Sequence, residues 1–134
     1  MFSYRLCWLL AICCGLLACQ PVATWDAEFI CTGLERSSTE IDGRNQPGMH
    51  KEIPLSVDLH LRGEHLLVKT WNAPVYSIDR DRLKFEVGNP SGQIEGEFRP
   101  ASGALTYVET RQMAVANSQH RVTLSGQFQC QAVR

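Results

Sequence analysis

The sequence predicts an all-β protein built as a small antiparallel barrel of about eight strands. Three observations lead to this fold class. Segments with an apolar residue at every second position recur along the chain, and glycine and proline turns separate them at intervals of roughly 8 to 12 residues. No segment after residue 18 has the convincing three-and-four spacing of an amphipathic helix. A closed barrel removes exposed strand edges, so we favour it over the alternative, a β-sandwich.

The clearest expected strand is 53–61, in which every odd position is apolar and no even position is. A period of two indicates a strand with one buried face. Pro54 has no N–H for a ladder bond, so this strand should begin there or lie at an edge. Residues 65–71 follow the turn at 62–64 as its hairpin partner. The other expected strands are 28–36, 83–87, 94–98, 105–110 and 122–130.

Two of these strands carry the same short pattern, I-x-G-x-F at 94–98 and L-x-G-x-F at 124–128. A glycine on the inward face of a strand lets a barrel bend sharply, or lets an aromatic ring pack over the backbone. The pattern is too short to be a repeat, but it supports the barrel.

The N-terminus has the features of an export signal. Arg5 precedes the uncharged apolar run 6–18, which is too short to cross a bilayer core of roughly 30 Å as a helix. The run ends in Leu16-Leu17-Ala18-Cys19, which resembles the lipobox of bacterial lipoproteins. Leu17 departs from the family pattern, which more often has Ala or Ser there. The alternative is an ordinary secretory signal with an incidental cysteine.

This resemblance implies a diacylglyceryl group on Cys19 and an acylated, palmitate-bearing amino terminus. Several acyl chains hold a protein firmly to a membrane. In the lipoprotein class, Gln20 in place of Asp implies sorting to the outer membrane, facing the periplasm. We therefore expect a signal peptide over 1–18, a lipidated tether over 19–27 and a single β domain over 28–134.

Two cysteines remain after the signal and the lipid site are set aside, Cys31 and Cys130. In an oxidising compartment such a pair predicts one disulfide, with two free buried thiols as the alternative. Disulfide geometry brings the two Cα atoms within about 7 Å. The first and last strands should therefore be neighbours or face each other across the core.

The composition excludes several function classes. The net charge is −1 with no basic run, so we expect no nucleic-acid binding. Nucleophile-elbow, zinc-protease and phosphate-loop motifs are absent from the sequence, so we predict no enzyme and no cofactor. Asp58, His60 and His65 were the best candidates for a metal site, but His60 falls on the solvent face of its strand, and we predict no metal.

Binding residues concentrate in loops, and three segments are candidates. The polar segment 37–52 is either a recognition loop or a mobile one. Trp71, Asn72 and Tyr76 place large aromatics at a strand end, where they either bind a partner or plug the barrel. The polar segment 111–120 reads as a further loop that could line the same end as Trp71.

These features favour a membrane-anchored module that binds an envelope protein, as an inhibitor, an immunity factor or an accessory subunit. One alternative is a carrier of a small apolar ligand inside the barrel, although the inward Leu59, Phe85, Phe98 and Phe128 favour a filled interior. A hydrolytic enzyme is the third and least favoured hypothesis.

Two further resemblances concern the mature domain. The stretch 94–105 is similar to a strand-turn-strand pattern of small uncharacterised periplasmic β proteins, which implies the fold alone. The lipobox, the small barrel and a cysteine near each end resemble membrane-bound lysozyme inhibitors. The serine-glycine-x-x-tyrosine loop of that family is not reproduced, because Tyr107 follows Ser102-Gly103 one residue too late.

Overall fold

The computed structural model describes residues 26–79 and 81–133, so the expected signal, lipid site and most of the tether lie outside the described residues. The strands are β1 (Ala27–Ile41), β2 (Arg44–Asn45), β3 (Lys51–Arg62), β4 (His65–Val68), β5 (Trp71–Asp79), β6 (Arg82–Asn89), β7 (Gly92–Arg99), β8 (Ala104–Val115) and β9 (Ser118–Ala132). One short 3-10 turn, η1 (Pro47–Met49), precedes β3. The described residues contain no helix with the length and hydropathy needed to cross a bilayer.

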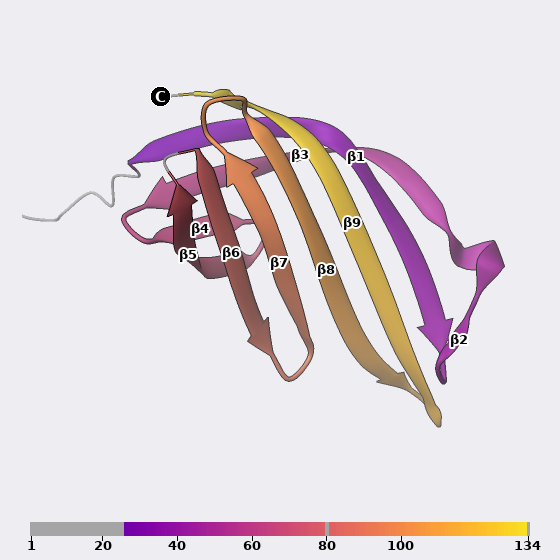
Figure 1. The fold of residues 1–134 in the computed structure, drawn as a ribbon. Coiled ribbons are helices and arrows are strands. Elements are labelled where there is room, and N and C mark those ends of the chain that lie inside the picture. Colours follow the sequence, from indigo (N-terminus) through magenta and orange to yellow (C-terminus); the bar gives the residue numbers. More distant parts are fainter. Residues whose placement is uncertain (1–25, 80, 134) are drawn as a thin grey trace, which may run out of the picture.

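The strands close into a ring. Each strand from β3 to β8 pairs antiparallel with its successor, β1 pairs with β3, and β9 returns to pair with β1. Figure 1 shows this curled sheet with β9 lying along β1. The two-residue β2 extends the sheet at one end of β1 and takes no part in the ring. The predicted antiparallel barrel is confirmed.

A disulfide joins the strands that close the ring. Cys31 of β1 and Cys130 of β9 lie directly opposite each other in the ladder, with Cα atoms 3.9 Å apart and sulfurs bonded at 2.02 Å. Both cysteines are buried. The predicted pairing of the first and last strands through this bridge is confirmed.

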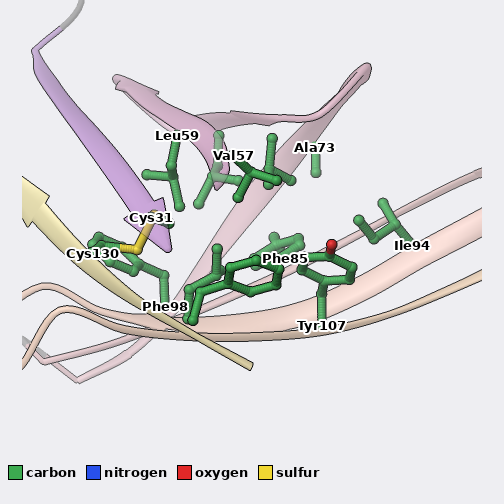
Figure 2. Close-up of a cluster of buried hydrophobic side chains, with 13 residues drawn as sticks. Cys31, Val57, Leu59, Ala73, Phe85, Ile94, Phe98, Tyr107 and Cys130 are labelled. Carbon is green, nitrogen blue, oxygen red and sulfur yellow. A yellow bond between two sulfur atoms is a disulfide. The ribbon is translucent and has the colours of Figure 1, made fainter. Parts of the chain in front are cut away.

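Apolar side chains fill the barrel, as Figure 2 shows. The four residues expected to point inward, Leu59, Phe85, Phe98 and Phe128, are all buried. The Tyr107 and Phe128 rings stack with centroids 5.5 Å apart. Full burial of one large apolar side chain contributes about 1.5–3 kcal/mol, so this packed interior is the main source of stability.

Two glycines make room for these rings. A Cβ added at Gly126 would lie 2.6 Å from Cζ of Tyr107, and one added at Gly96 would overlap the ring of Phe85. Of the two roles expected for these glycines, a sharp bend or a ring packed over the backbone, the structure shows the ring at both.

Pro54 lies inside β3, which begins three residues earlier at Lys51, so the expectation that the strand could begin at Pro54 is wrong. The edge prediction holds, because β3 pairs with β1 over its whole length but with β4 only from Leu59 onward. Pro54 therefore has a neighbouring strand on one side only, which suits a residue without an N–H.

Several segment boundaries differ from the prediction. The segment 65–71 is two strands, because the chain turns at Lys69 and Thr70, and Lys69 has the left-handed φ of 55° without being glycine. Trp71 begins β5 and Tyr76 lies within it, so these aromatics belong to a strand and not to a loop.

The segments 37–52 and 111–120 were expected as loops and are largely strand. β1 continues to Ile41, β8 continues to Val115, and β9 begins at Ser118. Polar side chains do not interrupt a ladder when they face solvent, so these strands run on past the last buried residue.

A candidate binding surface at the barrel mouth

Three strands run beyond the rest of the barrel at one end. β8 pairs with β7 only as far as Arg111, and β1 pairs with β3 only as far as Ser37. Residues 38–41 of β1, 112–115 of β8 and 118–123 of β9 continue as a three-stranded sheet, which we call the overhang. In Figure 1 these strands reach well past β4 and β5.

The two faces of the overhang differ in polarity. The ladders from β8 to β9 and from β9 to β1 have no register shift, so residues in line with the buried Tyr107 and Cys130 share the inner face. The inner rows contain Val122 and Thr39, in line with Arg111 at the base of the overhang, then Met113, His120 and Ile41, then Val115 and Ser118. The outer rows contain Thr110, Thr123 and Ser38, then Gln112, Arg121 and Glu40, then Ala114 and Gln119.

The inner face carries exposed apolar side chains beside polar ones. Met113 and Val115 each keep 47% of their surface accessible. Exposed apolar side chains that gather on one face mark interaction surfaces. The overhang therefore presents an unpartnered apolar face at the open end of the barrel.

Charged side chains lie between this face and the core. Glu109 of β8 is completely buried and Glu35 of β1 is nearly so. The Nζ atom of Lys69 bridges them, at 2.7 Å from Oε2 of Glu109 and 2.9 Å from Oε2 of Glu35. It also lies 5.3 Å from the centre of the Tyr107 ring, and the Tyr107 hydroxyl donates to Glu35.

The second oxygen of Glu109 accepts two further hydrogen bonds. Trp71 donates from Nε1 at 3.0 Å and Arg111 donates from Nε at 2.7 Å. Two carboxylates are thus matched by two cations. A buried charge that lost its partners would be strongly destabilising, so this charged network fixes β1, β5, β8 and the β4–β5 turn relative to one another.

The network shifts two pKa values. Burial alone would raise the pKa of Glu109, but hydrogen bonds from Lys69, Trp71 and Arg111 and the positive charge of Lys69 outweigh it, and the pKa lies below its usual value. Burial raises the pKa of Tyr107, and its hydrogen bond to Glu35 and the nearby carboxylate charges raise it further. Glu109 is therefore charged and Tyr107 protonated at neutral pH.

A cavity of about 370 Å³ opens beside the network. We call it the mouth cavity. Trp71 and Met113 form its apolar walls. Its polar lining consists of Thr70, Asn89, Ser91, Glu109, Arg111 and Gln112. The prediction that the segment 111–120 lines the same end of the barrel as Trp71 is confirmed.

The chain matches no family model, no curated protein and no solved structure.

The structure does not bring the three predicted partner-binding residues together. Trp71 is partly buried and its indole N–H binds Glu109, so it closes the end of the barrel and also lines the mouth cavity. Asn72 is exposed on the opposite face of β5. Tyr76, 60% exposed, stands on the outer face opposite Lys84.

Tyr76 borders a second concavity, of about 690 Å³, on the outer face of β6 to β9. Its walls include exposed Glu86 and Glu95, which lie opposite each other in the ladder, and the exposed Val108. Lys84, Glu86 and Glu95 on this wall are all exposed to solvent.

The other expected site residues are scattered. Among residues 26–79 and 81–133, no group of three or more His, Cys, Asp and Glu is placed to hold a metal. Nδ1 of His60 lies 3.4 Å from Glu28, and His65 is exposed at the start of β4. Ser102 is exposed in the β7–β8 turn, whereas Tyr107 is buried in the core.

Sequence reasoning missed the charged network. One signal was present, because Glu109 falls in phase with Leu105 and Tyr107 on an alternating strand. A carboxylate at an inward position requires a buried partner. Identifying Lys69 as that partner required the turn at Lys69 and Thr70, which no glycine or proline signals.

Proposed function

We propose that this protein is a membrane-anchored envelope lipoprotein whose β domain binds a protein partner through the inner face of the overhang. The observation that carries the proposal is the apolar pair Met113 and Val115, exposed on the inner face while the outer face is polar. Removing apolar surface from water contributes about 25 cal/mol per Å². A partner that covers this face gains that free energy.

The framework suits a binding surface. The disulfide closes the barrel, and the charged network fixes the strands beneath the overhang. A surface held in its binding conformation loses less conformational entropy when a partner docks. An inhibitor, an immunity factor and an accessory subunit all need such a preformed face.

The anchor in this proposal rests on the lipobox at Leu16-Leu17-Ala18-Cys19. Lipidation of Cys19 and sorting to the outer membrane would place the domain in the periplasm. There the tethered domain would meet envelope proteins at a high local concentration.

Carriage of a small apolar ligand is the less favoured function. Leu59, Phe85, Phe98 and Phe128 already occupy the interior, so a ligand would have to sit outside the packed core.

The test uses the tagged full chain as bait in detergent extracts of the native envelope. We expect one specific protein to be recovered at least about tenfold less with Met113→Asp/Val115→Asp, because each aspartate places a charge in the apolar contact. Ala114→Asp is the matched control, since Ala114 lies between the two residues on the polar face. Palmitate labelling of the same cells, absent in Cys19→Ser, checks the anchor.

Recovery of the same proteins with the double variant, or of no specific protein with the wild-type chain, would count against the proposal. Circular dichroism and oxidation of Cys31 and Cys130 check that each variant folds.

A further inference from the structure

We infer that the partner presents an acidic segment to the overhang and that one of its carboxylates binds Arg111 in the mouth cavity. This inference rests on the proposed function and adds the chemistry of the partner. The evidence is the distribution of charge around the mouth and the geometry of Arg111.

The register places more cations than anions on the inner face around the mouth. Lys51 shares a row with Ser37, and Arg44 shares a row with Ile41, so both lie on the inner face. The charged groups on this side are Arg44, Lys51, Lys69 and Arg111 against Glu35 and Glu109. These four cations and two anions give a balance of +2, whereas the chain as a whole carries a charge of −1, so the inner face at this end has the opposite sign.

Burial hides the negative groups more than the positive ones. The side chains of Glu35 and Glu109 keep 9% and 0% of their surface accessible, whereas that of Arg111 keeps 48%. The two carboxylates are therefore shielded from solvent, although Glu109 also lines the mouth cavity, whereas the guanidinium of Arg111 is half exposed. An approaching partner meets the positive charges first, which favours association with an acidic surface.

Arg111 is positioned to bind a carboxylate. Its Nε donates to Glu109 at 2.7 Å, which fixes the plane of the guanidinium. A guanidinium has five N–H donors, so the two terminal nitrogens can form the paired hydrogen bonds that arginine makes with carboxylates. Arg111 lines the mouth cavity together with Trp71 and Met113.

The cavity joins the apolar face directly, because Met113 belongs to both. Thr70 and Ser91 contribute hydroxyl groups to its wall and Asn89 contributes an amide. A segment with a carboxylate beside an apolar side chain would place the carboxylate in the cavity and the apolar side chain on Met113 and Val115. The partner segment should therefore carry a carboxylate next to an apolar side chain.

The test uses blocked tripeptides with leucine at both ends and glutamate, glutamine or lysine in the middle. Each is titrated into the isotope-labelled full chain in detergent micelles, and the Trp71 indole N–H signal is followed by NMR. We expect the glutamate peptide to bind at least about tenfold more tightly than the glutamine peptide, because only glutamate pairs with the guanidinium. The lysine peptide should cause no shift at the mouth.

Arg111→Gln should remove the preference for glutamate, while Arg111→Lys should keep part of it through its charge. Arg121→Gln is the matched control, because Arg121 lies on the outer face of the overhang. In Arg111→Gln, Lys69 and Trp71 still bind Glu109, and circular dichroism checks the fold.

Three results would overturn the inference: equal binding of the glutamate and glutamine peptides, a glutamate preference that survives Arg111→Gln, or no shift at the mouth with any peptide. The proposed function is judged separately. If the envelope partner is lost with Met113→Asp/Val115→Asp but retained with Arg111→Gln, then the apolar face binds it and the acidic chemistry is wrong.

Discussion

Glu109 is held charged inside the barrel by donors from three different parts of the chain. Lys69 comes from the β4–β5 turn, Trp71 from β5 and Arg111 from β8 itself. Removing a carboxylate from water is costly, and hydrogen bonds with opposite charge must offset that cost. The hydrogen bonds of Glu109 therefore help to fix the arrangement of the strands around the mouth cavity.

This arrangement predicts a dependence of stability on pH. The pKa of Glu109 is lowered in the folded chain, so its ionisation stabilises the fold at pH values above the unfolded pKa of about 4.3. That contribution is lost as the pH falls through the lower folded pKa. Glu109→Gln lacks this titration and is less stable at neutral pH.

Urea unfolding at several pH values measures the effect. The gap in unfolding free energy between the wild-type chain and Glu109→Gln should be largest near pH 7 and should narrow below pH of about 4. A gap that stays constant with pH would show that the Glu109 charge contributes nothing to stability.

For the strands, the alternation of apolar and polar residues predicted reliably that a strand exists but predicted its length poorly. The strands predicted at 53–61, 83–87, 94–98 and 122–130 all formed, because buried and exposed positions alternate there. The ends were missed wherever a strand continued without buried residues, as in the overhang. The turn at Lys69 was missed because an ordinary side chain adopts the left-handed conformation there.

Gly126 gives a prediction at this scale. A methyl group there would meet the rings of Tyr107 and Phe128 on neighbouring positions of β8 and β9. Gly126→Ala should lower the free energy of unfolding by about 1–3 kcal/mol, the usual effect of overpacking. Gly48→Ala is the control, because nothing lies within 4 Å of the added carbon. Denaturant titration compares the two, and equal stability would contradict the packing.

For the whole molecule, the alternating strands, their turns and two cysteines were enough to predict a closed barrel with its first and last strands joined. The overhang and the mouth cavity could not be predicted from the sequence, for a physical reason. Both features depend on how far β1 and β8 extend beyond the strands they pair with, and on the turn that brings Lys69 to Glu109. Trp71 was singled out correctly as lying at a barrel end, but its separation from Tyr76 follows from the two faces of β5.

Loss of the disulfide tests the closure of the barrel. The bridge spans 99 residues, and in the chain-entropy account a loop of this length contributes about 4 to 5 kcal/mol. Cys31→Ser/Cys130→Ser should therefore lower the melting temperature and the urea midpoint substantially. A double variant as stable as the wild-type chain would mean that the hydrogen-bonded ladder alone secures the ring.

The two sulfurs sit where the beginning and the end of the ring meet, although they are 99 residues apart in the chain. Contacts so distant in the chain form late, because the loop between them must first be ordered. A formed disulfide therefore indicates that β1 and β9 have paired. A catalyst of thiol oxidation would therefore act on this protein as the last step of its folding.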